Sequence, residues 1–378
     1  MHEIINGDCL EVMKTFPDNH FSSIVTDSPY GISFMGKDWD HGIPSIEYWE
    51  EMLRIVRPGG HLLSAGLPRM MHRLIGVIED AGFEIRDLIM HIFGSGFPKS
   101  HNHFGIDGYG TALKPAWEGW SLAMKPLEGT FAQNAEKWGQ AGINIDGCRI
   151  GSFENTIPSG LHRGKIADYS PKNDDDFKPE IGKNKGRWPA NVIFDEEAAA
   201  MLDEQSGSLH SAGKARPSIR QCEDKGIFGL PGDGHRIGDS GGASRFFYCA
   251  KTSSRERNEG LEGFPEKDPG FTCRLSNDGL HGNHNPRSRN NHPTVKPLKL
   301  MEYLIRLVMP PKDGLLLDPF AGSGSTILAA KRLNFPAIGI EKSAEYCEIA
   351  RARIAAVAEV AKIANPQLEL NLDAVNDQ

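Results

Sequence analysis

Apolar runs alternate with amphipathic stretches over the first hundred residues. Short apolar runs predict buried strands at 2–6, 21–25, 61–65 and 83–93. Between them, apolar residues recur every three or four positions, which predicts helices at 9–16, 45–56 and 70–81. This alternation of strand and helix is typical of a doubly wound, mostly parallel sheet with helices on both faces, so we expect an α/β fold.

The same alternation returns toward the C-terminal end after a long interruption. Helices are predicted there at 297–308, 325–332 and 343–364, and strands at 314–317 and 337–340. Between about 97 and 290 the periodicity fades, and Gly, Asn, His, Ser, Pro and Trp become frequent. We expect short strands at 142–145, 191–194 and 245–250, and long loops at 155–186 and 206–242. Loops of that length are often functional, so we interpret this central part as an insertion specialised for recognition.

Composition narrows the class of protein. A chain of 378 residues, 39% hydrophobic and 24% charged, fits one large domain with insertions or two domains. No apolar run approaches the roughly 20 residues needed to span a bilayer, and the N-terminus shows no signal-peptide pattern. The six cysteines are scattered singly, as is typical of reduced cytosolic thiols, so we expect a cytoplasmic protein.

No metal site is expected from the cysteine and histidine spacing. Three histidines lie within twenty residues of Cys273, but their separations do not match a zinc signature; they are His281, His284 and His292. Exposed or DNA-facing histidines are the simpler interpretation.

Charge is unevenly distributed along the chain. The formal net charge of -8 argues against a uniformly basic nucleic-acid binder. Three runs nevertheless carry basic residues and no acidic ones, at 182–194, 211–220 and 283–299. Such segregation is expected where one face meets a polyanion, although each run by itself is also typical of a solvated loop.

A first group of chemically active residues follows the predicted strand 21–25. It reads Asp27-Ser28-Pro29-Tyr30, and the carboxyl end of a strand is where open α/β sheets bind ligands. Asp27 can accept a hydrogen bond from an N–H, the Ser28 carbonyl can accept a second, and Tyr30 can stack on a ring. The group therefore suits a flat, amine-bearing ring; the alternative is a proline turn closed by a solvated aspartate.

A second group follows the predicted strand 314–317. It reads Asp-Pro-Phe-Ala-Gly-Ser-Gly from Asp318, and Glu341 ends the next strand about twenty residues later, where an acid can hold ribose hydroxyls. Neither a dinucleotide fingerprint nor a Walker loop is present. Because an acid before the glycines would repel a pyrophosphate and favour an ammonium or sulfonium, the pattern predicts a cationic nucleoside without phosphate. S-adenosylmethionine fits; the alternative is a glycine turn of an ordinary α/β protein.

A third motif, His-Pro-Thr-Val-Lys-Pro from His292, precedes the second. With these three motifs in this order, the chain resembles the amino-methylating DNA methyltransferases in their beta arrangement, over about residues 1–97 and 245–360. The resemblance implies a Rossmann-like methyltransferase fold with circularly permuted motif order. It further implies a catalytic half at 1–97, a loop-rich target-recognition insertion at 98–244, a cofactor-binding half at 245–365 and a tail at 366–378.

The resemblance also implies roles for individual residues. A flipped target base would be held by Asp27, Ser28, Pro29 and Tyr30. Asp8 would contact the adenine of S-adenosylmethionine and Glu341 the ribose. The methionine end would be contacted by Asp318, Phe320, Gly322 and Gly324, with Thr294 and Lys296 flanking the methionine carboxylate. The full expected cofactor set is Asp8, Cys9, Thr294, Lys296, Asp318, Pro319, Phe320, Ala321, Gly322, Ser323, Gly324, Ser325, Glu341 and Lys342. Contacts to double-stranded DNA are expected from basic residues of the loops, namely Lys37, Lys183, Lys185, Arg187, Lys214, Arg216, Arg287 and Arg289.

The target base is the least constrained expectation. Adenine-N6 enzymes of the resembled family usually read Asp-Pro-Pro-Tyr and cytosine-N4 enzymes Ser-Pro-Pro-Tyr, whereas here Asp27 comes first and Ser28 replaces a proline. We therefore expect adenine-N6 methylation, with cytosine-N4 methylation as the nearest alternative. Methylation of a protein glutamine or of RNA, and a catalytically idle DNA-binding regulator, remain open. Cytosine-C5 methylation commonly uses a cysteine after proline, and this chain has none. Beta-arranged enzymes often pair, so the resemblance suggests a homodimer.

Overall fold

The computed structural model describes residues 1–31, 42–94, 106, 108–151, 186–210, 240–250, 254–266, 271–276, 279–284, 288–292, 295–311 and 314–357. The chain divides into two compact units. Unit 1 combines Met1–His91, Trp117–Asn144 and Ala250–Gln378, and unit 2 combines Ile92–Ala116 and Ile145–Cys249.

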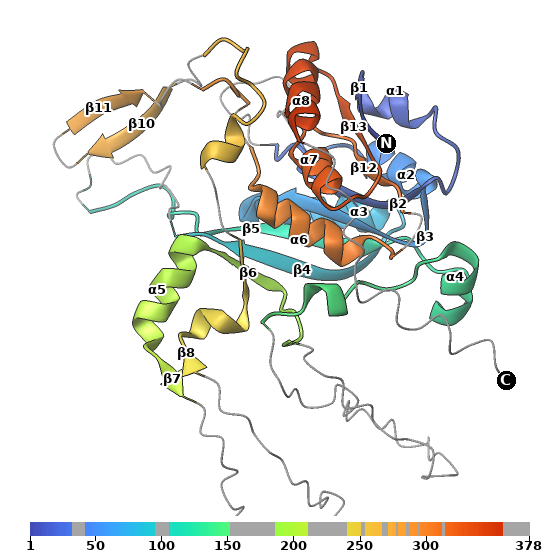
Figure 1. Cartoon of the computed structure of the whole chain (residues 1–378), viewed down its shortest axis with the longest axis horizontal. Helices are drawn as coiled ribbons and strands as arrows, with labels where there is room; N and C mark the ends of the chain where they lie inside the picture. Colours follow the sequence, from blue (N-terminus) through green and yellow to red (C-terminus); the bar gives the residue numbers. More distant parts are fainter. Residues whose placement is uncertain are drawn as a thin grey trace, which may run out of the picture. The chain divides into compact units, whose positions relative to one another are not determined.

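Unit 1 is built on a sheet to which both ends of the chain contribute (Figure 1). Neighbouring strands follow in the order β1 (His2–Asn6), β13 (Ala337–Glu341), β12 (Leu316–Asp318), β2 (Phe21–Thr26), β3 (Val56–Gly66), β5 (Trp117–Met124) and β4 (Glu84–Ile92). Pairing is parallel from β1 through β3 and antiparallel between β3 and β5. The expected mostly parallel α/β sheet is confirmed.

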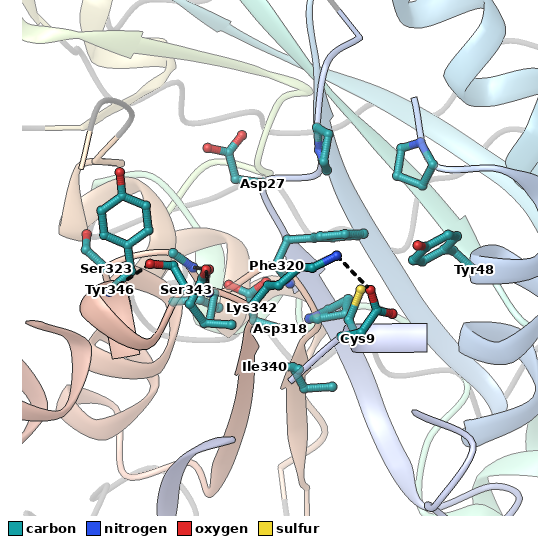
Figure 2. A pocket seen from close by; sticks show the side chains of 18 of the residues that line it. Cys9, Asp27, Tyr48, Asp318, Phe320, Ser323, Ile340, Lys342, Ser343 and Tyr346 are labelled. Atoms are coloured by element: carbon teal, nitrogen blue, oxygen red, sulfur yellow. Dashed lines mark hydrogen bonds and ion pairs between the residues drawn. The ribbon is translucent and has the colours of Figure 1, made fainter. Parts of the chain in front are cut away.

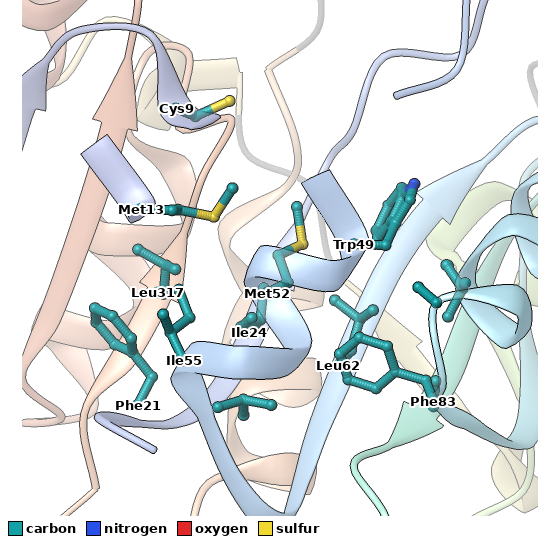
Figure 3. Packing of buried hydrophobic residues seen from close by; sticks show 14 of the residues in the cluster. Cys9, Met13, Phe21, Ile24, Trp49, Met52, Ile55, Leu62, Phe83 and Leu317 are labelled. Atoms are coloured by element: carbon teal, nitrogen blue, oxygen red, sulfur yellow. The ribbon is translucent and has the colours of Figure 1, made fainter. Parts of the chain in front are cut away.

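Helices cover both faces of this sheet. Successive strand residues point to opposite faces, so a strand that is buried throughout needs a covering layer on each side. Ile24 belongs to a buried apolar cluster with residues of α1 (Cys9–Met13), α2 (Ile46–Ile55) and α3 (Pro68–Asp80). The preceding residue, Ser23, instead donates a hydrogen bond to the carbonyl of Val308, in α6 (Leu298–Val308). Figure 3 shows the packing of the cluster around Trp49, Met52 and Leu317.

The remaining helices of unit 1 complete the two layers. They are α4 (Phe131–Trp138), α7 (Ser325–Arg332) and α8 (Ala344–Ala356), with a 3-10 turn at Ser254–Arg257. Helix α6 is buried nearly all round, as its strongly apolar sequence requires. A hairpin of β10 (Phe271–Ser276) and β11 (Gly279–His284) also belongs to this unit. No helix within the described ranges is long and apolar enough to cross a bilayer.

The stretch from Trp117 to Asn144 differs from its expected place in the central insertion. It belongs to unit 1, and β5 pairs with β3 through registers such as Ala65↔Trp120. Its Gly, Ser and Ala residues show no alternation of apolar and polar positions, so the sequence did not predict a strand here. Small residues do leave room for a large neighbour, and the Trp120 side chain is fully buried. Two smaller expectations also differ: residues 142–145 form no strand, and α8 ends at Ala356 within the described residues rather than near 364.

Unit 2 contains shorter elements. These are a 3-10 turn at Asp146–Cys148, β6 (Val192–Asp195), α5 (Glu196–Ser206), β7 (Leu209–His210), β8 (Ser240–Gly241), a 3-10 turn at Ala243–Phe246 and most of β9 (Tyr248–Ala250). The strands expected near 191–194 and 245–250 are therefore confirmed, the second only in its last part. Helix α5 begins where the Asp195 carboxylate accepts a hydrogen bond from the Ala198 amide at 2.7 Å. Most of the two long loops expected here lies outside the described residues.

Candidate active site

A cavity of about 650 Å³ opens in unit 1 and is lined from both ends of the chain (Figure 2). Pro29 and Asp27 of the first motif line it, and so do most of the expected cofactor residues: Asp8, Cys9, Lys296, Asp318, Pro319, Phe320, Ala321, Gly322, Ser323, Ser325, Glu341 and Lys342. Ser28, Tyr30 and Gly324 lie next to lining residues in the sequence. Thr294 is outside the described residues.

Sheet topology explains why two motifs almost 300 residues apart meet. Strands β2 and β12 are parallel neighbours, with Ile24 opposite Leu317, so Asp27 and Asp318 emerge at the same edge. The fully buried Thr26 hydroxyl donates to Asp318 Oδ1 at 2.7 Å and joins the two motifs directly. The structure thus brings together the two constellations that the sequence places far apart.

Asp318 is a buried carboxylate, and among the described residues its hydrogen-bond donors include no basic side chain. Burial raises its pKa to about 6, and the bonds from Thr26, Thr326 and the Phe320 amide oppose that rise. A carboxylate in this setting gains free energy from any cation that reaches it, because water screens it poorly.

The glycine turn is closed by Glu341. The Gly322 amide donates to Glu341 Oε2 at 2.9 Å, and the Ser343 amide donates to Oε1 at 2.7 Å. Gly322 has a φ of +52°, and a Cβ there would lie 2.7 Å from Nε2 of His292. Only glycine therefore satisfies both the backbone conformation and the close approach of the imidazole.

An aromatic wall of the cavity joins Phe320, an expected cofactor contact, to Tyr48, which the sequence predictions missed. The rings of Tyr48 and Phe320 stack with centroids 6.2 Å apart, and Ile43 and Pro44 extend this surface. Figure 2 shows Tyr48 beside Cys9 at the same end of the cavity. Such a wall can hold a flat ring through apolar and stacking contacts.

Asp27 lies in a network of buried charges. The Tyr30 hydroxyl donates to Asp27 Oδ1 at 2.8 Å, and Lys296 Nζ lies 3.3 Å from the same oxygen and 2.8 Å from the Tyr30 hydroxyl. Burial raises the pKa of Asp27, while the Lys296 ammonium opposes the rise. Both of these contacts use Oδ1; within the part of the chain that the structure describes, Oδ2 has no hydrogen-bond partner.

Glu118 completes this network and was missed by the sequence predictions. It lies in β5, its Oε2 is 2.8 Å from Lys296 Nζ, and its Oε1 is 3.3 Å from Nδ1 of His91. Burial alone would raise the pKa of Glu118, but Lys296 and His91 outweigh it and hold the value at about 2. Burial would likewise lower the pKa of Lys296, yet Asp27 and Glu118 raise it well above its ordinary value. The one signal in the sequence is an acid within an otherwise uncharged strand.

Comparison with known families decides the identity of this fold. A family model described as DNA methylase, covering the N6 and N4 methyltransferases, matches residues 145–352, more than half of the chain. The chain belongs to the N6/N4 family of DNA methylases.

Curated relatives of this chain match over shorter stretches. It is 41% identical over 76 residues to the type II methyltransferase M2.MboI of Moraxella bovis, which is 20% of this chain and 28% of the relative. It is 51% identical over 63 residues to M.HindIII of Haemophilus influenzae, 17% and 20% of the two chains. These matches span between a fifth and 28% of the relatives' own length. Among solved structures, the cytosine-N4-specific PvuII DNA methyltransferase aligns with a TM-score of 0.47 and 15% identity, over 97% of this chain and 90% of that one.

The geometry gives further partners to two of the expected contact residues. Lys296 was expected beside the methionine carboxylate; it lines the cavity, but its ammonium is engaged by Asp27, Glu118 and Tyr30. Ser28 replaces the usual proline, and its buried hydroxyl lies 3.0 Å from the hydroxyl of Ser64. The serine is therefore accommodated by the neighbouring strand.

The residues expected to contact DNA fall in several places. Arg187, in unit 2, pairs with the backbone of Ile150, and its guanidinium lies 4.5 Å from the centre of the Phe246 ring. Arg289, in unit 1, lies 3.6 Å from Glu266. The others are outside the described residues: Lys37, Lys183, Lys185, Lys214, Arg216 and Arg287. No cluster of three possible metal ligands occurs among the residues that the structure describes.

Proposed function

We propose that this methylase transfers the methyl group of S-adenosylmethionine to the exocyclic N6 amine of adenine in duplex DNA. The observation that carries the proposal is the shared cavity: Asp27 and Asp318 open on one space and are joined through Thr26. An acceptor for an amine and an acceptor for a cation thus lie at a single sheet edge.

The residues around the cavity fit S-adenosylmethionine. A volume of about 650 Å³ lies within the range of small-molecule sites. Asp318 and Glu341 are acids suited to a cationic nucleoside, and the Tyr48–Phe320 wall suits a flat base. When bound, the cofactor supplies a methyl group on a positively charged sulfur.

The protein's own residues would activate the target amine. An exocyclic amine is a poor nucleophile because its lone pair is delocalised into the ring. Hydrogen bonds from its N–H groups to Asp27 and to the Ser28 carbonyl return electron density to nitrogen. Because the Ser28 hydroxyl lies against Ser64, the backbone carbonyl is the group we assign to the amine. Positioning and electrostatics then supply the rate.

A covalent mechanism has no support from the cysteine that lines the cavity. Burial, with Asp8 adding to it, raises the pKa of the Cys9 thiol to about 12, so it is protonated at neutral pH. The target amine, which lies inside the duplex, must be flipped out at a cost of a few kcal/mol. Stacking on Tyr30, worth roughly 1–3 kcal/mol, offsets part of that cost, and basic loop residues hold the phosphates.

Mass spectrometry of nucleosides tests the proposal directly. The full chain is incubated with duplex DNA and S-adenosylmethionine, and the DNA is digested to nucleosides. N6-methyladenine is the expected product. If N4-methylcytosine is found instead, the target base is cytosine and the proposed mechanism stands. If neither methylated base is found, the proposed function is refuted.

Asp27→Ala separates the two halves of the site. Transfer should fall by about 100-fold to 1,000-fold, because one preorganised partner of the amine is lost. The cofactor dissociation constant, measured by calorimetry, should stay within a few-fold of the wild-type value. Equal loss of transfer and of cofactor affinity would contradict the division of roles between Asp27 and Asp318.

A further inference from the structure

Glu118 stands at the catalytic edge of the sheet although it comes from a strand remote in sequence. Strand β5 runs antiparallel to β3, with Gly66 opposite Gly119, so the first residues of β5 lie at the carboxyl end of β3. Asp27 follows β2, the parallel neighbour of β3, at this same edge. The antiparallel direction of β5 is therefore what delivers Glu118 to the site.

Two carboxylates share one ammonium there. Lys296 Nζ lies 2.8 Å from Glu118 and 3.3 Å from Asp27, and the three side chains are 12%, 13% and 18% exposed for Lys296, Glu118 and Asp27. The shorter contact is the one to Glu118. At such low exposure water cannot replace a missing partner, so the free energy of each carboxylate depends on how closely the ammonium approaches it.

The other oxygen of Glu118 is also engaged. Nδ1 of His91 lies 3.3 Å from Oε1, while Oε2 faces Lys296 and lies 3.5 Å from the Tyr30 hydroxyl. Glu118 is thus held on both oxygens, and it can fix the position of Lys296 and, through Lys296 and Tyr30, that of Asp27.

We propose that Glu118 is a positioning residue for methyl transfer: by drawing the Lys296 ammonium to itself, it keeps the Asp27 carboxylate oriented and open to the target amine. This inference rests on the proposed function. Without Glu118, Asp27 is the carboxylate left to this ammonium within the described part of the chain, and a full ion pair there competes with the amine for the same acceptor. If Glu118 served only the stability of the fold, its removal would not change how available Asp27 is to the amine.

A double-mutant cycle tests this role. The variants are Glu118→Gln, Lys296→Met and the double variant, with Glu3→Gln, an exposed glutamate of β1, as the matched control. Single-turnover transfer to DNA should slow by about 10-fold to 100-fold in Glu118→Gln. Cofactor affinity should stay within twofold, and Glu3→Gln should match the wild type. Because Glu118 acts through Lys296, the double variant should be no slower than Lys296→Met alone.

Three results would overturn the inference. They are an unchanged single-turnover rate in Glu118→Gln, a parallel loss of cofactor affinity, or additive losses in the double variant. Any of these, alongside normal wild-type methylation, leaves the proposed function intact.

A second measurement does not depend on DNA. Carbon-13 NMR of labelled aspartate follows the ionisation of the Asp27 carboxyl, identified by its absence in Asp27→Ala. The charged and titratable groups facing it are Lys296, Glu118, Tyr30 and Asp318. Glu118→Gln removes a like charge and gives Lys296 wholly to Asp27, so the pKa of Asp27 should fall. An unchanged or higher value refutes the shared ammonium, even if the wild-type chain methylates no DNA.

Discussion

Replacing Thr26 with valine would remove one hydroxyl from the junction between the two motifs while nearly preserving the shape of the side chain. That hydroxyl donates to Asp318 Oδ1 at 2.7 Å, and the threonine is fully buried. Because the threonine itself is fully buried, water is not expected to take the place of its hydroxyl. The carboxylate would keep two donors, the Phe320 amide at 3.1 Å and the Thr326 hydroxyl.

The expected change in the pKa of Asp318 follows from the contribution of a hydrogen bond to a charged acceptor. A hydrogen bond to a charged group contributes about 1.5–3 kcal/mol, and one pKa unit corresponds to about 1.4 kcal/mol. Losing it should raise the pKa of Asp318 from about 6 by about one to two units. The ionised carboxylate favours a cationic cofactor, so affinity falls as pH drops through the pKa. In the variant that fall should begin near neutral pH.

Calorimetric titration with S-adenosylmethionine between pH 5 and 9 measures the shift. The logarithm of the dissociation constant, plotted against pH, should bend near 6 for the wild type and about one to two units higher for Thr26→Val. Thr26→Ser keeps the hydroxyl and should bend where the wild type does. A Thr26→Val curve that coincides with the wild type would refute the assignment of Asp318 as the anionic cofactor contact.

Three further predictions concern the glycine turn, the core and the basic loops. Gly322→Ala should weaken cofactor binding more than tenfold, since its Cβ would meet the imidazole at 2.7 Å and a positive φ adds about 1 kcal/mol of strain, whereas Gly142→Ala, with nothing within 4 Å, should bind normally. Burial lowers the pKa of His61 to about 4, below its unfolded value of about 6.5. The neutral ring therefore stabilises the fold fully above pH 6.5, and about 3 kcal/mol should be lost as pH falls to 4; urea unfolding of His61→Gln should lack that part of the slope. Lys183→Ala should weaken DNA binding and flatten its salt dependence in fluorescence anisotropy, and an unaltered salt slope would remove this lysine from the interface.

Much of the fold and of the cofactor half of the site could be predicted from the sequence. Strand and helix periodicity placed β2, β12 and β13 close to their observed bounds. Parallel strands of such folds carry ligands at their carboxyl ends, so residues directly after a predicted strand could be assigned to one edge. Asp27, Asp318 and Glu341 were found in this way, and the structure brings all three to one cavity.

The sequence by itself determined which acidic and aromatic residues come directly after each strand, because periodicity and motif order depend on neighbours along the chain. Only the tertiary structure decided that β5 enters the sheet antiparallel to β3, and with it the place of Glu118. The same holds for the Tyr48–Phe320 wall and for the sharing of Lys296 between two carboxylates. Pairing between strands distant along the chain depends on which surfaces are buried together, and the local sequence pattern does not specify it.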